Sequence, residues 1–429
     1  MPDYEQVLFK NRKPNRSATL DEYRQSGGYE ALRKFVGEKL PPGEVTRLVD
    51  ESGLRGRGGA GFPAGKKWAA VPQNGAHPRY LVANADEMEP GTFKDRVLMH
   101  VDPHCIIEGM VLAGYSFAAS KAFFFVRPSY ESVAVIFERE LEQARRAGLL
   151  GDNILGSGYS FDIVVHRSGG RYICGEASAL LNAIMGKRPN PVKPPPYPTE
   201  KGLWQKPTVV NNVETLANVP HILGNGTEWF KSLSLTPHGS GTKLFCVSGK
   251  VKVPGAVELP MGVRLSELIE EHCGGMHDGS EFKACLPGGA STRYLTRAHY
   301  DVRMDFDDLK AVGNRLGTAA VMVFDQKTCM VGATLNLMQF FARESCGWCT
   351  PCREGLPYMR DLLWKIENGE GEEEYIPMLR AMCKQVWNSY CALAPGAAEP
   401  VISLLDDFED EVREHIRQKG CPFHAQARY

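Results

Sequence analysis

YLVANADEMEPG, residues 80–91, joins a short apolar run directly to a polar loop. Residues 80–83 have the length and the apolar character of a buried strand. Further strands and helices are expected along the next eighty residues, at 104–119 (helix), 122–126 (strand), 130–147 (helix) and 161–165 (strand). Because strands alternate with helices, the sequence predicts a mostly parallel α/β sheet.

Polar loops follow the predicted strands, at the position where open α/β sheets bind their ligands. After the first strand, carboxylates and an amide offer acceptors for ribityl or ribose hydroxyls and for a carboxamide: Asn84, Asp86, Glu87 and Glu89. A second loop offers a ring, a close backbone approach and a carboxylate at a helix start: Tyr172, Gly175 and Glu176. Two adjacent amides, Asn211 and Asn212, precede a third helix and suit a phosphate or the edge of a flavin.

A glycine-dense loop, RGRGGAGFPAGKKW at residues 55–68, lies upstream of the first strand. Gly56, Gly58 and Gly61 match the G-x-G-x-x-G pattern, but a helix precedes them and a proline follows, so a Rossmann fingerprint is rejected. Glycines let a backbone approach a flat ligand or a phosphate closely. Positive charge and stacking faces come from neighbours in the same loop: Arg57, Lys66, Lys67, Phe62 and Trp68. A flexible loop without a ligand is the alternative. Beside this loop, the polar loops favour a nucleotide or flavin site over ordinary turn chemistry.

The C-terminal part contains a second motif, ESCGWCTPCR at residues 344–353. Three thiolates at Cys-x2-Cys-x2-Cys spacing favour a 4Fe–4S cluster, which takes four; zinc sites more often use two separate pairs. Three cysteines compete for the fourth position: Cys383 fits a helix interior, Cys421 precedes a proline in a polar tail, and Cys391 lies between predicted helices, where a loop can turn back. The other cysteines are interpreted as small buried apolar residues: Cys105, Cys174, Cys246, Cys273, Cys285 and Cys329.

The pattern along the chain predicts three domains, at 1–240, 241–328 and 329–429. Residues 244–251 and 255–259 are typical of a hairpin and precede a helix at 264–273, which indicates a small α+β domain. The last domain is predicted to be helical, with helices at 355–368, 372–386 and 396–417.

Composition narrows the function. A net charge of −1 does not suggest nucleic acid as a partner. No apolar run approaches the roughly 20 residues of a membrane helix, and the N-terminus lacks the pattern of a signal peptide. We therefore expect a cytosolic protein without disulfides, which reaches a membrane only through partners.

Together these motifs resemble the flavin-bearing, NADH-oxidising subunit of respiratory complex I (NADH:quinone oxidoreductase), the 51 kDa or F-type subunit, and most closely its bacterial form. The resemblance covers almost the whole chain and rests on five stretches: residues 56–63, 84–96, 171–176, 210–215 and 344–355. It implies a multidomain α/β protein with a non-standard Rossmann-like FMN domain, a ubiquitin-like β-grasp domain and a C-terminal helical bundle holding a 4Fe–4S cluster. It also implies hydride transfer from NADH to FMN, then one-electron transfer to the cluster and onward to quinone.

The resemblance assigns roles to individual residues. FMN would be held by residues of the polar loops: Asn84, Asp86, Glu87, Tyr172, Gly175, Glu176, Asn211 and Asn212. The dinucleotide would lie along the glycine loop, at Gly56, Arg57, Gly58, Gly59, Ala60, Gly61, Phe62 and Lys67. Phe62 would stack on the adenine, with Trp204 as a weaker candidate. Glu89 and Glu87 are the expected catalytic residues, Glu89 meeting the nicotinamide end. The cluster ligands would be Cys346, Cys349, Cys352 and Cys391.

Partners and location also follow from the resemblance. It implies a small 2Fe–2S subunit and a large multi-cluster subunit, which together form the tip of a complex at the cytoplasmic face of the inner membrane. The alternative is the diaphorase subunit of an NAD-dependent formate dehydrogenase or hydrogenase. Such subunits often carry extra iron–sulfur domains, for which this sequence has no cysteines upstream of Cys105.

One position departs from the family pattern. The family commonly has two glutamates after Ile-Cys-Gly, whereas this chain has Glu176 followed by Ala177. In the family the second carboxylate lies near the adenosine ribose, where it repels the 2′-phosphate of NADP. We hypothesise that Ala177 weakens this repulsion, so that the protein tolerates NADPH better than its relatives. The alternative is that neighbouring groups compensate and NADH remains the substrate.

Overall fold

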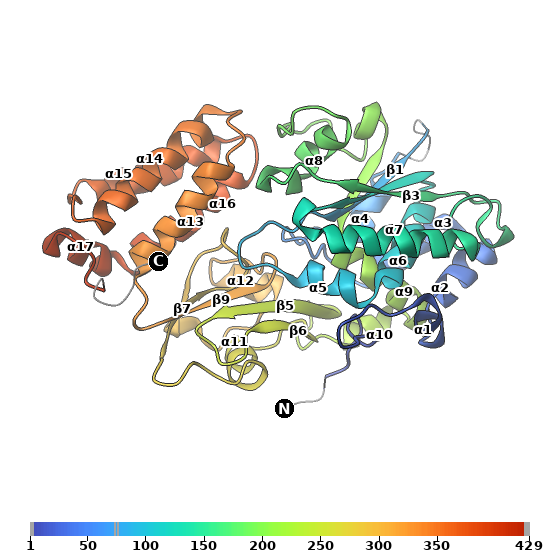
Figure 1. The fold of residues 1–429 in the computed structure, drawn as a ribbon, viewed down its shortest axis with the longest axis horizontal. Coiled ribbons are helices and arrows are strands. Elements are labelled where there is room, and N and C mark those ends of the chain that lie inside the picture. Colours follow the sequence, from blue (N-terminus) through green and yellow to red (C-terminus); the bar gives the residue numbers. More distant parts are fainter. Residues whose placement is uncertain (1–3, 73, 75–76, 424–429) are drawn as a thin grey trace.

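The computed structural model describes residues 4–72, 74 and 77–423. Figure 1 shows a parallel sheet with helices packed around it, a second sheet beside it and a group of helices at the C-terminal end. The mixed α/β architecture predicted from the sequence is confirmed.

The first sheet is four-stranded and parallel, in the order β3-β2-β1-β4. Its strands are β1 (Tyr80–Ala85), β2 (Lys121–Val126), β3 (Asp162–Arg167) and β4 (Thr208–Asn212). The helices before and between these strands are α1 (Leu20–Gln25), α2 (Glu30–Leu32), α3 (Pro42–Glu51), α4 (Ala64–Ala69), α5 (Lys94–Val101), α6 (Pro103–Ser116), α7 (Glu131–Arg146) and α8 (Ala177–Ile184). After β4 come α9 (Val213–Asn225) and α10 (Thr227–Ser232). The strands at 122–126 and 161–165 lie within one residue of their predicted starts.

Helix α6 forms the centre of this part, and all its residues are buried. The helix begins after Asp102, whose carboxylate accepts the N–H of Cys105 at 3.1 Å, and Pro103 occupies its first position. Gly109 allows α9 to pack directly against α6, because a Cβ there would overlap the backbone carbonyl of Leu216. This close packing places the start of α9, and Asn212 before it, at the edge of the sheet where β1 ends.

The second sheet has five strands in the order β6-β5-β9-β7-β8. They are β5 (Thr242–Gly249), β6 (Gly255–Pro260), β7 (Phe282–Leu286), β8 (Leu295–Thr296) and β9 (Ala320–Asp325), with short helices α11 (Leu265–Glu267) and α12 (Phe306–Ala311). β5 and β6 form the predicted antiparallel hairpin, and β5 pairs in parallel with β9. First and last strands paired in parallel at the centre, with hairpins outside, make the β-grasp arrangement.

The C-terminal part is helical, with α13 (Met330–Glu344), α14 (Thr350–Glu367), α15 (Tyr375–Gln385), α16 (Leu393–Asp407) and α17 (Glu409–Gln418). The single helix predicted at 396–417 is wrong: the chain turns at Phe408, whose φ of −136° is not helical. The Phe408 ring packs edge-on against Tyr294 of the β-grasp part, with 6.0 Å between centroids, and this contact accompanies the break. None of the helices among the described residues could span a membrane.

Candidate flavin and iron–sulfur site

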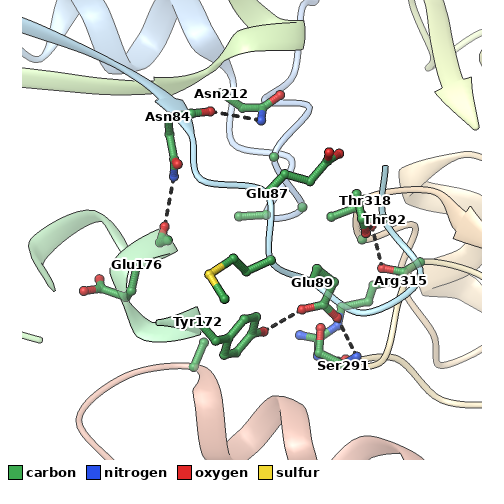
Figure 2. A pocket seen from close by; sticks show the side chains of 18 of the residues that line it. Asn84, Glu87, Glu89, Thr92, Tyr172, Glu176, Asn212, Ser291, Arg315 and Thr318 are labelled. Atoms are coloured by element: carbon green, nitrogen blue, oxygen red, sulfur yellow. Dashed lines mark hydrogen bonds between the residues drawn. The ribbon is translucent and has the colours of Figure 1, made fainter. Parts of the chain in front are cut away.

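A cavity of about 680 Å³ lies where all three parts of the molecule meet. The loop after β1 crosses it, as Figure 2 shows, and the glycine loop and the 172–176 segment form further walls. The β-grasp part contributes Ser291, Arg315 and Thr318, and the helical part contributes Cys391. The predicted residues that line this cavity are Gly58, Gly59, Ala60, Asn84, Asp86, Glu87, Glu89, Tyr172, Gly175, Glu176, Asn212 and Cys391.

Asp86 has a buried carboxylate with unmet hydrogen-bonding capacity. Its side chain is at the cavity wall, and neither oxygen makes a hydrogen bond of ordinary length with the described residues. Burial raises the pKa of Asp86 to about 6, against the opposing influence of Ser168 and Arg127. A buried acceptor without a donor is costly, and the hydroxyls of a ribityl chain supply such donors.

Glu87 differs from Asp86 because both of its oxygens are engaged. They accept the backbone N–H groups of Asp95 and Arg96, at 2.8 and 3.1 Å, and the phenol of Tyr130 at 3.1 Å. Glu87 therefore holds the first turn of α5, where a carboxylate also meets the positive end of the helix dipole. Burial, followed by the nearby Asp95, raises the pKa of Glu87 to about 7.

Glu89 is held from two sides in the middle of the cavity. The phenol of Tyr172 donates to one oxygen at 2.5 Å, and the backbone N–H of Ser291 donates to the other at 2.7 Å. Figure 2 shows the carboxylate between these two groups. Since Tyr172 belongs to the first part and Ser291 to the β-grasp part, Glu89 also joins the two.

Asparagine side chains fix the loops around the end of β1. Asn84 donates to the carbonyl of Gly175 at 2.9 Å and accepts the N–H of Asp86 at 3.1 Å. Asn212 caps α9 by accepting the N–H of Glu214 at 3.0 Å. A Cβ on Gly58 would lie 3.0 Å from the Cβ of Asn212, so the glycine loop approaches this corner as closely as its backbone allows.

A buried charge network lies behind the cavity. Lys94, which lines the cavity, contacts Asp95 at 2.6 Å and Glu214 at 2.8 Å, and Lys243 of β5 contacts Glu214 at 2.7 Å. The lysines lower the pKa of Glu214 to about 2 although burial opposes this, while burial lowers the pKa of Lys243 to about 8. Sequence reasoning missed Lys94 as a site residue, although it stands three residues after Gly91 in a quoted motif.

Several predicted ligand-binding residues do not line the cavity: Gly56, Arg57, Gly61, Phe62, Lys67 and Asn211. Arg57 is buried and donates to the carbonyl of Ser240. Lys67 donates to the carbonyl of Val210, and Asn211 accepts from the Trp68 indole at 2.9 Å. Phe62 and Trp204 are exposed, at 53% and 47%. Their assignments stay predictions.

The cysteine run starts helix α14. Cys349 is the residue before its first turn and Cys352 lies within that turn, where the helix dipole favours a thiolate. Burial raises the pKa of Cys352 to about 11, and the Cys349 and Cys346 thiols act in the same direction. Burial likewise raises the pKa of Cys391 to about 12, with smaller contributions from Cys352 and Cys346. The four thiols therefore lie close enough to influence one another, and a cluster with four thiolate ligands fits this donor set.

Cys383 and Cys421 have other surroundings. Cys383 is buried in α15, and the charged groups that influence it are Arg380, Asp406 and Glu399. Cys421 lies beside Cys329 and Glu367. Among the three candidates for the fourth position, Cys391 alone has Cys346 and Cys352 among the groups that influence its pKa.

The β-grasp residues of the cavity had no signal in the sequence. Lys310, Asn314, Arg315 and Thr318 belong to no motif and lie more than two hundred residues from the loop after β1. Thr318 shares a hydrogen bond of 2.7 Å with Thr92, and Arg315 donates to the carbonyl of Ser291. Only the folded arrangement brings them to the site.

Fold and site together define a flavin- and iron–sulfur-binding oxidoreductase subunit, and comparison with known proteins agrees. Residues 49–221 match the Nuo51 FMN-binding domain, 244–294 the SLBB domain, and 332–415 the NADH-ubiquinone oxidoreductase-F iron-sulfur binding region. The F-type subunits of NADH-quinone oxidoreductase from Salmonella typhimurium and from Escherichia coli are each 47% identical over 426 residues, which is 99% of this chain and 95% of theirs. A second F-type subunit of the same enzyme, from Rhizobium meliloti, is 47% identical over 98% of this chain and 100% of its own.

The chain belongs to the family of F-type subunits of NADH-quinone oxidoreductase, and the resemblance seen in the sequence is confirmed. It is thus a subunit of complex I. A solved NAD+-reducing [NiFe]-hydrogenase is also similar, with a TM-score of 0.82 and 34% identity over 95% of this chain and 67% of that chain. The diaphorase alternative is not better supported, since the F-type relatives share more identity and near-complete mutual coverage.

Proposed function

We propose that the cavity binds FMN against the loop after β1 and receives NADH from the side of the glycine loop. The observation that carries this proposal is the composition of its wall: Asp86, Glu89 and Cys391 come from different parts of the chain and line one cavity. Bound FMN takes a hydride from NADH and passes electrons singly to a 4Fe–4S cluster. The residues at the wall bind, orient and shield the reactants.

Each side chain then has a distinct task. Asp86 accepts ribityl hydroxyls, which relieves its unpaired state, while Asn84 and Asn212 hold the loop backbones in place. Glu89 presents fixed acceptor oxygens to the carboxamide of the nicotinamide. Glu87 positions α5 through its backbone hydrogen bonds. Lys310 and Arg315 add positive charge for phosphate groups.

On this proposal the division into 1–240, 241–328 and 329–429 separates FMN binding, bridging and cluster binding. The ligands of the cluster are Cys346, Cys349, Cys352 and Cys391. Electrons leave through a small 2Fe–2S subunit and a large multi-cluster subunit at the cytoplasmic face of the inner membrane, on the way to quinone.

An anaerobic absorbance titration tests this function. NADH should bleach the flavin absorbance of the purified protein stoichiometrically, and iron and acid-labile sulfide should be present at about four each per cluster. A protein with no flavin, or with flavin that NADH does not bleach in the presence of the partner subunits, would contradict the proposal.

Ala177 makes the choice between NADH and NADPH testable. A carboxylate near the adenosine ribose repels a 2′-phosphate, so Ala177→Glu should lower kcat/KM for NADPH relative to NADH by roughly 5- to 30-fold, which corresponds to about 1–2 kcal/mol. Val135→Glu on the outer face of α7 adds the same charge at an exposed position and should leave the ratio unchanged. An unchanged ratio in Ala177→Glu would show that other groups select the dinucleotide.

A further inference from the structure

Four potential metal ligands converge in the helical part, apart from the cysteine run. Cys329, Glu367, His415 and Cys421 each offer one ligand atom, and these atoms all lie within 4.8 Å of one another. They come from the start of α13, the end of α14, the last turn of α17 and the segment after it. None of the four lines the cavity.

The distances between the ligand atoms fit one small ion. Cys329 Sγ lies 3.3 Å from His415 Nε2 and 3.4 Å from Glu367 Oε2, and these last two atoms are 3.3 Å apart. Tetrahedral zinc binds nitrogen and oxygen at about 2.0–2.2 Å and sulfur at about 2.3 Å, which gives tetrahedron edges of about 3.3–3.8 Å. The group needs little movement to close around the ion.

The orientation of His415 is that of a metal ligand. Its Nδ1 lies 2.7 Å from the carbonyl of Glu411 and donates to it. In neutral histidine this leaves the lone pair of Nε2 facing a carboxylate oxygen and a sulfur, which are themselves acceptors. A hydrogen bond from Nδ1 to a carbonyl is the usual way in which a ligating histidine is fixed.

Cys329 is prepared to act as a thiolate. It stands at the N-terminus of α13, and its Sγ accepts the N–H of Gly332 at 3.1 Å. The helix dipole and an N–H donor both favour negative sulfur. Burial alone raises the pKa of this thiol strongly, so the thiolate needs a cation beside it.

We propose that Cys329, Glu367, His415 and Cys421 bind a structural Zn²⁺ ion. Four protein ligands leave no open position, as in structural rather than catalytic zinc sites. Binding releases the two thiol protons to solvent and involves no redox step. Cys329 and Cys421, which sequence reasoning treated as a buried apolar residue and as a competing cluster ligand, thereby share one role.

The position of the site explains what the ion does. Cys329 lies between β9 and α13, where the β-grasp part passes into the helical part. Glu411, one turn before His415, accepts the N–H of Met330 at 2.6 Å and the ammonium of Lys283 of β7 at 2.7 Å. The ion therefore fastens the end of the chain to this junction, next to contacts that already join the two parts.

Metal analysis of the full chain, purified anaerobically with its partner subunits and without chelators, tests the proposal. Mass spectrometry of the metals should find one zinc more in the wild type than in Cys421→Ser or His415→Ala, with iron and acid-labile sulfide unchanged. Cys383→Ser, in a buried cysteine outside both sites, should retain the zinc. Zinc-edge X-ray absorption of the wild type should show sulfur at about 2.3 Å together with nitrogen or oxygen at about 2.0–2.2 Å.

Several outcomes would overturn the zinc site. These are equal zinc in the wild type and Cys421→Ser, iron in place of the additional zinc, and a mass that reveals a Cys329–Cys421 disulfide in the native protein. An imidazolium–carboxylate pair without metal would give the first result. Because the measurement counts metal and does not depend on NADH oxidation, failure of the zinc site leaves the proposed function untouched.

Discussion

Asp86 shows how a single residue reports on a ligand. Its carboxylate is buried, lines the cavity and lacks hydrogen bonds of ordinary length from the described residues. A charged hydrogen bond is worth about 1.5–3 kcal/mol. Asp86→Asn should therefore weaken FMN binding about 10- to 100-fold, measured by the quenching of flavin fluorescence. Asp152→Asn, at an exposed site, should bind FMN as the wild type does. Equal affinity in both variants would remove Asp86 from the binding site.

The same carboxylate predicts a pH dependence in flavin-free protein. The pKa of Asp86 is raised to about 6 in the folded state by burial, above its ordinary value of about 3.9. The folded state therefore binds the proton more tightly, and this group reduces stability as pH rises from about 4 to about 6. Asp86→Asn should be more stable than the wild type at pH 7, by up to about 3 kcal/mol, and the difference should vanish near pH 4. Denaturant unfolding at both pH values measures it; a constant difference would contradict the raised pKa.

Tyr172 offers a test of Glu89 without changing its charge. Tyr172→Phe removes the phenol that donates to Glu89 at 2.5 Å and retains the ring. Loss of one hydrogen bond to a charged group should lower kcat/KM for NADH about 10-fold, mainly through KM if Glu89 positions the nicotinamide. Steady-state kinetics with an artificial acceptor measures this. Tyr159→Phe, whose phenol donates to Ala119 far from Glu89, is the control, and an equal loss there would indicate a general packing effect.

At the scale of whole elements, apolar runs predict the strands and periodic spacing predicts the helices. β1, β2 and the β5–β6 hairpin can be found in this way. β4 cannot, because its last residues are Asn211 and Asn212 and their amides suggest a loop. The break between α16 and α17 also escapes prediction, since the contact of Phe408 with Tyr294 depends on tertiary structure and leaves no local signal.

The charge network joins three elements, since Lys94 begins α5, Glu214 begins α9 and Lys243 lies in β5. Removing one partner of a buried ion pair costs about 3–5 kcal/mol. Glu214→Gln should reduce the free energy of unfolding by this amount. Lys243→Met should cost less, because burial already lowers the pKa of Lys243 to about 8 and Lys94 still neutralises Glu214.

Acid gives a second measure of this network. The pKa of Glu214 is lowered to about 2, chiefly by Lys243 and Lys94 against burial. A lowered pKa contributes stability above the ordinary value of about 4.3, and the contribution disappears as pH falls towards 2. Urea unfolding of the wild type and Glu214→Gln should therefore differ most near neutral pH and converge below about pH 3. Equal stability at pH 7 would show that the network does not join these elements energetically.

At the scale of the whole molecule, the cavity is a product of long-range packing. Motifs predict the loop after β1 and the 172–176 segment because their chemistry is local. They do not separate Arg57 and Lys67, whose cationic groups are engaged by backbone carbonyls, from residues that face the cavity. Nor do they identify Lys310 or Arg315, which reach the site only when the β-grasp part packs against the first part.

The position of Cys391 connects the cavity to electron transfer through the whole complex. Cys391 lines the cavity, and its thiol is influenced by Cys352 and Cys346. If it is the fourth cluster ligand, Cys391→Ser should leave NADH oxidation by ferricyanide, which needs only the flavin, within about 2-fold of the wild type, because the flavin-binding side chains are unchanged.

Reduction of quinone by the assembled complex should fall at least about 10-fold in the same variant, because the electrons lose their first one-electron acceptor. Electron paramagnetic resonance of the NADH-reduced protein should show the cluster signal lost or altered. Cys383→Ser is the matched control, since this buried cysteine of α15 is influenced by none of the run. Loss of the cluster in Cys383→Ser, with an intact signal in Cys391→Ser, would move the fourth ligand from the cavity wall into the helical core. The short route from flavin to cluster that the fold provides would then no longer hold.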